Sequence, residues 1–370
     1  MLDIKKIRED LHRIPEIAFH EFKTQEYILT CLKKYEGLKI HTFKTTGILV
    51  EYNNGSGEYQ LFRADMDALP ISEETGCKFT SEHPGFMHAC GHDIHMTILL
   101  GLIDRVVAEQ PEHNILFLFQ PAEEGAGGAK RLLQDSIWQK FEISTVHALH
   151  VNGKLPVGMI STKPGIFFAN TVEVDVEIKG KSSHVAFPEA GKDALKGGML
   201  FLNYFDEEVK IWGIKDVAWG FGHMMAGRVR NAIAADCKLE GTYRAFNHED
   251  RSRLKEITKI CADKVEQKLG VVVTITFLEE YEQVENNPEL VEKLKIVTAE
   301  LNYRYEEAEQ VFTGEDFGFF TDLYPGILFW LGVNPKNPQE NIQELHAHNF
   351  LPDDNCIEVG INAMWEMIAR

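Results

Sequence analysis

Two short segments of the chain gather side chains that bind metal ions. Residues 87–95 read Met-His-Ala-Cys-Gly-His-Asp-Ile-His, and residues 119–124 read Phe-Gln-Pro-Ala-Glu-Glu. Cys, His and Glu are the usual side-chain ligands of zinc. A second carboxylate beside a ligand is well placed to act as a general base toward a metal-activated water. The two segments therefore indicate metal-assisted hydrolysis.

The other donors of such a site come from distant parts of the chain. Cys90 and His92 lie two apart, so an extended backbone turns both toward one side. Glu124 and His150 follow apolar runs, and a C-terminal imidazole comes from residues 345–350, Leu-His-Ala-His-Asn-Phe. A lone His or Cys is more often a packed or surface residue, but here the donors cluster. Because they exceed one tetrahedral site, the sequence predicts two metal ions that share a bridging ligand.

Alternating strands and helices must position these donors. Residues 47–52, 59–65, 114–120 and 146–151 read as strands, and residues 96–109 as a helix with one apolar face. The unbroken apolar run at 114–120 is typical of a strand buried on both faces. The pattern predicts an α/β sheet with helices on both sides. In such sheets ligands gather at the carboxyl ends of the strands, where the sequence places Asp65, Asp67, Glu123, Glu124 and His150.

The pattern changes near residue 170. Residues 170–180, 235–244 and 271–277 read as half-buried strands, with helical stretches at 191–208 and 248–269. A β-α-β-β-α-β order of this length favours a ferredoxin-like insert. The earlier pattern resumes with a helix at 288–302, an apolar strand at 326–332 and a helix at 354–369. We therefore expect a discontinuous catalytic domain, 1–169 and 285–370, with a small α+β domain inserted at 170–284.

The bulk composition excludes some classes of protein. A net charge of −19 over 370 residues argues against nucleic-acid binding, which requires a surplus of Lys and Arg. No apolar run approaches the roughly 18 residues of a membrane span, and the N-terminal residues lack a hydrophobic signal core. We therefore expect a cytoplasmic protein. Its six cysteines show no framework spacing and are interpreted as reduced thiols.

The motifs resemble those of the M20 metallopeptidase-type amidohydrolases, in the subgroup of aminoacylases and hippurate-type hydrolases. The resemblance extends over nearly the whole chain, and its motifs occur in the family's order. They are residues 8–16 with the later Glu21, then residues 63–70, 88–93, 119–124, 149–151 and 313–317. The resemblance implies a zinc-peptidase-like catalytic domain with helices on both sides of a mixed sheet, and an inserted lid that also forms the dimer.

The resemblance also implies a role for each donor. Cys90 bridges two divalent ions, His92 and His150 complete one site, and Glu124 and His346 complete the other. His348 is the alternative to His346, and zinc, manganese, cobalt and nickel all suit such mixed donors. Glu123 is the general base, and Asp67 is a second catalytic carboxylate that orients a ligand histidine. Where other branches carry a metal-binding His, this chain has Asp65; His88 and His95 are expected to be structural.

The resemblance assigns three residues of the insert to the substrate. His184, in Gly180-Lys-Ser-Ser-His184, polarises the scissile carbonyl in an oxyanion-type role, from its own chain or from the neighbouring subunit. Asn231 and Arg244 match positions that grip the substrate carboxylate. The family's Asn-Val-Ile-Pro is Asn231-Ala-Ile-Ala234 in this chain. The resemblance implies a homodimer formed through the insert.

Several segments are most similar to one branch of the family, the N-acetyldiaminopimelate deacetylases. They are residues 148–151, 155–165, 312–318 and 329–333. This likeness implies deacetylation of N-acetyl-L,L-diaminopimelate to L,L-diaminopimelate and acetate, a reaction of lysine biosynthesis. The alternatives are a broader N-acyl-amino-acid or hippurate hydrolase, a dipeptidase, and a catalytically idle binding protein on the same scaffold.

Overall fold

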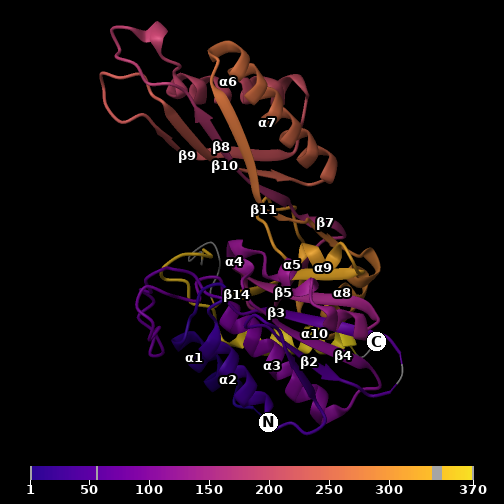
Figure 1. Ribbon diagram of the computed structural model, residues 1–370. Coiled ribbons are helices and arrows are strands. Elements are labelled where there is room, and N and C mark those ends of the chain that lie inside the picture. The colour runs from indigo at the N-terminus through magenta and orange to yellow at the C-terminus, as the bar shows by residue number, and fades with distance from the viewer. Residues whose placement is uncertain (1, 56, 336–343, 369–370) are drawn as a thin grey trace. The chain divides into compact units, whose positions relative to one another are not determined.

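A computed structural model describes residues 2–55, 57–335 and 344–368, and these residues form two compact units. The first comprises residues up to Phe167 together with Val284–Glu309 and the residues from Asp316 onward. The second comprises Phe168–Gln283 and Gln310–Glu315. Figure 1 shows the elements of both units. None of the described helices is long and apolar enough to cross a membrane.

The first unit is built on an eight-stranded mixed sheet, in the order β1-β2-β4-β3-β5-β14-β6-β13. Strands β3, β4, β5 and β14 run parallel to their neighbours within this group, whereas β2 is antiparallel to β1 and β4. The strands are β1 Lys39–Thr42, β2 Ile48–Tyr52, β3 Tyr59–Asp65, β4 Asn114–Gln120, β5 Ile143–Pro156, β6 Met159–Thr162, β13 Arg304–Glu307 and β14 Gly326–Asn334. A small second sheet pairs β7 Gly165–Phe168 with β12 Val284–Asn286.

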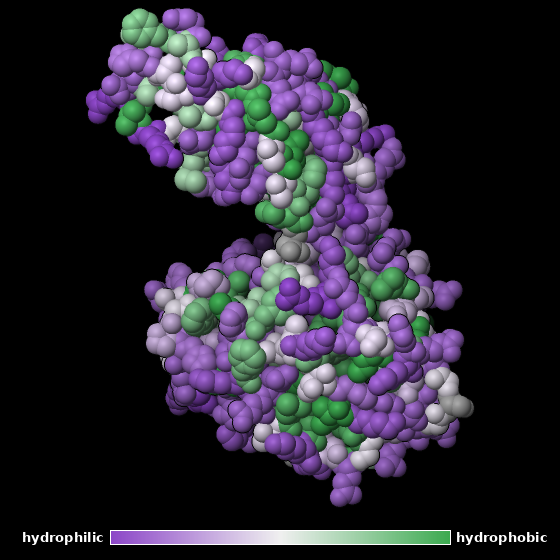
Figure 2. All heavy atoms as spheres, in the orientation of Figure 1, coloured by the Kyte–Doolittle hydropathy of each residue, from purple (hydrophilic) through white to green (hydrophobic). Residues whose placement is uncertain are grey.

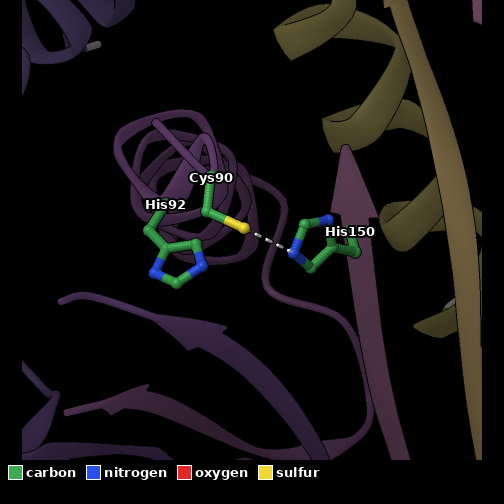
Figure 3. Close-up of side chains that lie close together, drawn as sticks. All are labelled: Cys90, His92 and His150. Atoms are coloured by element: carbon green, nitrogen blue, oxygen red, sulfur yellow. Dashed lines mark hydrogen bonds between the residues drawn. The ribbon is translucent and has the colours of Figure 1, made fainter. Parts of the chain in front are cut away.

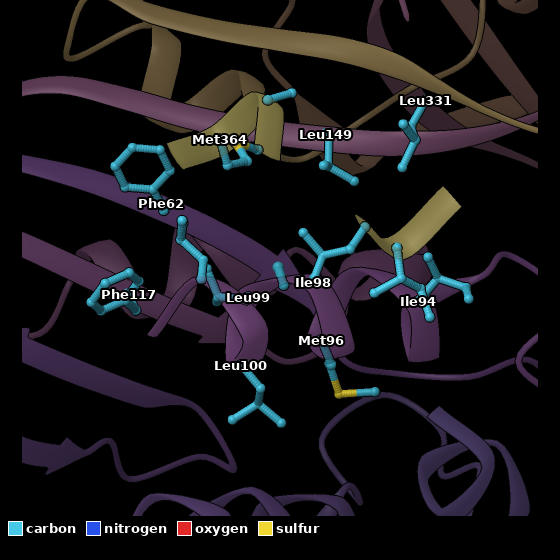
Figure 4. Close-up of a cluster of buried hydrophobic side chains, with 14 of the residues drawn as sticks. Phe62, Ile94, Met96, Ile98, Leu99, Leu100, Phe117, Leu149, Leu331 and Met364 are labelled. Carbon is cyan, nitrogen blue, oxygen red and sulfur yellow. The ribbon is translucent and has the colours of Figure 1, made fainter. Parts of the chain in front are cut away.

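Helices cover both faces of this sheet because its central strands are apolar on both sides. Phe117 and Phe119 of β4 belong to one large core, whereas Leu116 and Leu118 are buried on the other face. The large core is closed by α1 Ile4–Arg13, α2 Phe22–Leu32, α3 His92–Glu109, α8 Pro288–Glu300 and α10 Asn355–Ile368. Figure 4 shows side chains of β3, β4, β5 and β14 packed against α3 and α10. The short helices α4 Glu123–Ala126, α5 Gly128–Leu133 and α9 Gly318–Thr321 and a 3-10 turn Ser136–Lys140 complete the unit.

The second unit has the β-α-β-β-α-β order that the sequence predicts. Its elements are β8 Asn170–Lys179, a 3-10 turn Pro188–Ala190, α6 Ala194–Ile211, β9 Val217–Ala226, β10 Asp236–Ala245, α7 His248–Leu269 and β11 Val272–Tyr281. The antiparallel sheet has the order β11-β8-β10-β9, which is the ferredoxin-like order of fourth, first, third and second strands. Alternate residues of β8, from Val172 to Ile178, form a core with α6 and α7. The predicted fold class is confirmed.

One segment joins a different unit from the one that the sequence indicated. Residues 310–315 were expected in the catalytic domain, but they associate with the second unit. The backbone N–H of Ala169 donates to the carbonyl of Val311 at 3.0 Å, and the rings of Phe246 and Phe312 lie 4.5 Å apart. These contacts connect the segment to the second unit.

Candidate metal centre

The turn before α3 places Cys90 and His92 side by side. Gly91 adopts a left-handed conformation with a φ of 79°, and a Cβ atom there would lie 2.5 Å from a methyl group of Val151. Only glycine meets both conditions. The helix consequently begins at His92, rather than at residue 96 as predicted, and both side chains point into one buried space (Figure 3).

Cys90 belongs to two groups of potential metal ligands. The donor atoms of Cys90, His92 and His150 lie within 4.8 Å of one another, and so do those of Cys90, Glu124 and His346. Cys90 Sγ is 3.4 Å from Nε2 of His150, the contact drawn in Figure 3. Cys90 is therefore the donor that these two groups have in common. The structure thus brings together all five residues that the sequence named as ligands.

The two buried histidines are oriented for ligation by their second ring nitrogens. Nδ1 of His92 donates to the backbone carbonyl of Asp67 at 2.8 Å, and Nδ1 of His150 donates to that of Val151 at 2.9 Å. In the neutral form of each ring the proton is therefore on Nδ1, and Nε2 is left to bind a metal ion. Nε2 of His92 is buried and makes no hydrogen bond with any described residue. Backbone carbonyls fix ligand histidines in this way in many metal sites.

The charges of the cluster also fit a divalent cation. Burial, together with Glu124 and Glu123, raises the pKa of the Cys90 thiol well above its usual range. Burial opposes protonation of His92, but Asp65 and Asp67 outweigh it and raise its pKa to about 10. The surrounding carboxylates therefore attract positive charge. A metal ion supplies that charge and stabilises the thiolate, so the residues present suit divalent metals.

Two carboxylates hold the segment that carries Glu123 and Glu124. The side chain of Asp67 accepts hydrogen bonds from the backbone N–H groups of Glu123, at 3.1 Å, and Glu124, at 3.0 Å. Glu21 accepts from the N–H of Ala122 at 3.0 Å. Ala122 has a φ of 59°, a conformation that costs an alanine about 1 kcal/mol or more. Asp67 therefore fixes both glutamates, in addition to orienting His92 through its backbone carbonyl.

The two C-terminal histidines have different surroundings. The backbone N–H of His346 donates to the carbonyl of Ala89 at 2.9 Å, beside Cys90. Its Nε2 lies 3.2 Å from Oε1 of Glu124. His348 instead pairs with Glu74 at 3.5 Å, and both of these side chains are exposed. The geometry favours His346 as the fifth donor.

The residues assigned to the substrate lie in the second unit, and one chain does not bring them together. His184 forms an isolated bridge with Ala232, and the N–H of Val185 donates to the carbonyl of Asn231 at 3.0 Å. This pair lies before the start of β10, whereas Arg244 lies near its end, beside Gly314. A strand of this length spans roughly 30 Å. Asn231 and Arg244 of the same chain therefore cannot grip one carboxylate.

The ring of His184 is arranged to donate a hydrogen bond. Its Nδ1 accepts the backbone N–H of Ala186 at 3.1 Å, so a neutral ring carries its proton on Nε2. Such a donor is suited to a developing oxyanion. Arg244 lies 3.6 Å from Glu173 in a half-buried ion pair, which a substrate carboxylate can replace.

Two contacts of the centre were not predicted, although both residues lie within motifs of the family resemblance. Glu21 reaches Ala122 across a sequence separation that no local pattern reveals. Asp316, within the motif at 313–317, accepts from Nη2 of Arg63 at 2.9 Å and from Nε2 of Gln120 at 2.8 Å. It is buried, and its hydrogen bonds hold Arg63 and Gln120 in place.

Known proteins match this architecture along its full length. The chain is 39% identical to N-acetyldiaminopimelate deacetylases from Bacillus velezensis and Bacillus subtilis, covering 97% of this chain and 96% of each relative. A putative aminohydrolase from methicillin-resistant Staphylococcus aureus has a TM-score of 0.91 at 26% identity, covering 99% of this chain and 95% of its own. The YXEP protein of Bacillus subtilis, described as a dinuclear metal-binding peptidase of the M20 family, has a TM-score of 0.84 at 28% identity, with 99% and 96% covered.

The family assignment rests on most of the chain. Residues 61–370 match the family described as peptidase family M20/M25/M40. This range contains every proposed metal ligand and the Glu123–Glu124 pair. The chain therefore belongs to peptidase family M20/M25/M40.

Proposed function

We propose that this protein removes the acetyl group from N-acetyl-L,L-diaminopimelate, producing L,L-diaminopimelate and acetate. The observation that carries the proposal is the shared position of Cys90 in two donor groups, next to the buried Glu123. Relatives with that printed activity cover nearly the whole chain. The reaction belongs to lysine biosynthesis.

Five residues hold the metal ions in this proposal. Cys90 would belong to the donor sets of both ions, with His92 and His150 in one set and Glu124 and His346 in the other. Zinc, manganese, cobalt and nickel all suit these donors. When bound, two such ions polarise the acyl oxygen and lower the pKa of an attacking water.

Glu123 moves the proton in this reaction. It takes a proton from the attacking water as the water oxygen bonds to the acyl carbon. It then delivers that proton to the amide nitrogen as the carbon–nitrogen bond breaks. Asp67 fixes the backbone of Glu123 by accepting its N–H at 3.1 Å. Nε2–H of His184 donates to the oxyanion that forms on the acyl oxygen.

The second unit supports a homodimer in which two chains complete each site. Strand β9 lies at an edge of its sheet and is paired only with β10 among the described strands. Leu195 and Met199, one turn apart on α6, and Met224 and Met225 on β9 are exposed apolar side chains. Figure 2 shows apolar groups interrupting the hydrophilic surface of this unit. We propose that a second copy covers this edge of the sheet, with Met224 and Met225 on its two faces.

A dimer would also let residues that lie far apart in one chain act on the same substrate. His184 and Asn231 of one chain can act with Arg244 of the other, whereas they lie at opposite ends of β10 in a single chain. The molecular mass in solution tests the dimer. Met225→Asp should shift the protein toward monomer and reduce turnover, and a fully active monomer would contradict the arrangement.

A pair of arginines favours a substrate with two carboxylates. Arg228 and Arg230 are exposed on the loop that leads to Asn231, and neither forms an ion pair with any described residue. They place two positive charges close together in a chain whose net charge is −19. Acetyldiaminopimelate carries a second, distal carboxylate that guanidinium groups suit, whereas hippurate carries only one. We propose that this loop binds the distal carboxylate.

A substrate panel with the metal-loaded protein tests the proposal. Turnover of N-acetyl-L,L-diaminopimelate, hippurate, N-acetyl-L-alanine and a dipeptide is measured with each candidate metal. We expect the highest kcat/KM for the acetylated diaminopimelate, with loss on chelation and recovery on metal return. A preference for hippurate would instead support the broader hydrolase, and cleavage of the dipeptide alone would support a peptidase.

A further inference from the structure

The imidazole of His95 lies beside both buried histidines that are proposed as metal ligands, His92 and His150. Its ring is stacked 5.4 Å from that of His92, and it meets His150 edge-on at 4.7 Å between ring centroids. It is buried, and it is one of three residues, with Asp65 and His92, whose donor atoms lie within 4.8 Å of one another. Proximity alone would allow it to be a ligand.

Both ring nitrogens of His95 are already used. The backbone N–H of Val151 donates to Nε2 at 2.9 Å, so Nε2 carries no proton. Nδ1 therefore carries the proton and donates it to Oδ1 of Asp65 at 2.6 Å. With neither lone pair available, His95 does not ligate in this structure. Its hydrogen bonds instead connect Asp65 to the backbone next to His150.

Val151 is the link between His95 and the ligand. Its N–H is held by His95, and its carbonyl accepts the Nδ1 proton of His150 at 2.9 Å. The orientation of the His150 ring consequently depends on the position of this one residue. We propose that His95 is a positioning residue, which fixes Val151 and through it the imidazole of His150 for metal binding.

Asp65 is in turn fixed, and kept from ligating, by Arg63. Nη1 of Arg63 donates to Oδ2 of Asp65 at 2.7 Å, the oxygen that lies 3.7 Å from Nε2 of His92. A fixed guanidinium beside that oxygen opposes a metal ion there. Nε of Arg63 donates to Gln120 at 2.9 Å, and Asp316 accepts from Arg63 and from the N–H of Ala129. Every side chain in this series is buried.

Three substitutions of His95 separate positioning from simple packing. In His95→Gln the amide oxygen can stand in for Nε2 and accept the Val151 N–H, whereas in His95→Asn the amide nitrogen can stand in only for Nδ1. His95→Leu loses both bonds. Affinity for Zn²⁺ and Co²⁺ is measured by chelator competition, together with the absorption spectrum of the Co²⁺-loaded protein and the stability of the metal-free protein.

Loss of an outer partner of a ligand typically lowers metal affinity about 10- to 100-fold. We expect that loss for one of the two ions in His95→Leu, with an altered Co²⁺ spectrum, and a better recovery in His95→Gln than in His95→Asn. His147→Leu is the matched control, because His147 is a buried imidazole on the same strand whose ring stacks on Phe62. It should reduce stability and leave both affinities unchanged.

The inference rests on the proposed metal centre, and the same measurements distinguish the two. A wild-type protein that binds no metal would contradict the proposed function. A wild-type protein with two ions, combined with wild-type affinities and spectrum in His95→Leu, would overturn the positioning role. Equal affinity losses in His95→Gln and His95→Asn would also overturn it, and that comparison decides the question if the leucine variant does not fold.

Discussion

Oε1 of Glu124 lies 3.2 Å from Nε2 of His346. A loop near the C-terminus therefore adds a side chain to the centre, whose other residues include Glu124 after β4 and His150 in β5. This contact stabilises the ionised form of the Glu124 carboxylate. Burial raises its pKa, but the hydrogen bond from His346 and the charge of His92 lower it overall. Glu124 is therefore an anion ready to bind a cation, with His346 as its neighbour in the same donor group.

His346→Ala is expected to lose one of two bound ions, because it removes a donor from the group that contains Glu124. Its affinity for that ion should fall by more than the about 10- to 100-fold seen when only an outer partner is lost. His348→Ala is the control, since His348 pairs with the exposed Glu74. Metal counted after dialysis distinguishes them, and undiminished metal in His346→Ala would assign the ligand elsewhere.

Glu123→Gln is expected to keep both metals and lose turnover. Loss of general acid–base catalysis typically lowers the rate about 100- to 10,000-fold, and the backbone bond from Glu123 to Asp67 does not depend on the carboxylate. Glu124→Gln, one residue on, should instead lose metal. Single-turnover rates and metal content are measured on the same samples. A near wild-type rate in Glu123→Gln would exclude this residue as the base.

The sequence predicted side chains that the structure brings together, because strand ends and short spacings are local properties. The apolar run of β4 predicts where Glu123 and Glu124 emerge, and the spacing of Cys90 and His92 predicts a common direction. The choice between His346 and His348 was open, because only the tertiary contact with Ala89 and Glu124 separates them.

Other features depend on contacts that no local pattern carries. The second strand of the insert, β9, has no clear alternating pattern, because Gly220 and Gly222 interrupt it. The separation of Asn231 from Arg244 follows from the length of β10, which is a property of the assembled sheet. The assignment of Gln310–Glu315 depends on pairing with Ala169.

Removal of Cys90, the donor that both groups share, is expected to lower the affinity for both metal ions. In Cys90→Ala, a metal concentration that saturates the wild type should no longer raise the melting temperature. A metal ion stabilises the folded state only when its concentration is comparable to or above the Kd for that state. His92→Ala should retain part of the metal-dependent rise. Cys356→Ala is the matched control: it removes a buried thiol of the core outside the centre, so it should lower stability and keep the rise. A full metal response in Cys90→Ala would refute the bridging role.

Neutralising the arginine loop is expected to change specificity. In the double variant Arg228→Gln and Arg230→Gln, kcat/KM for N-acetyl-L,L-diaminopimelate should fall about 10- to 100-fold, the effect of losing hydrogen bonds to a charged group. Hippurate hydrolysis should change little. Arg253→Gln on α7 controls for the altered charge of the second unit. An equal fall in kcat/KM for both substrates would show that the loop does not bind the distal carboxylate.

Glu21 links stability to pH through a buried carboxyl group. Burial raises its pKa to about 7, and it accepts hydrogen bonds from Phe19, Thr46 and Ala122. Below its unfolded pKa both states hold the proton, so the group costs nothing. As the pH rises toward 7 the unfolded state releases the proton first, so the free energy of unfolding falls. A shift of this size corresponds to about 3 kcal/mol at most.

Glu21→Gln should remove this pH dependence and keep the three hydrogen bonds, because the amide oxygen can accept both N–H groups and the amide nitrogen can face the Thr46 hydroxyl. The metal-free wild type should therefore become less stable relative to Glu21→Gln as the pH rises, by about 1 kcal/mol between about pH 6 and about pH 8. Denaturant unfolding of both proteins at each pH measures this difference. Glu21→Ala should be less stable throughout, since Ala122 then loses its acceptor. A difference between wild type and Glu21→Gln that stays constant with pH would mean that Glu21 is ionised in the folded protein across this range.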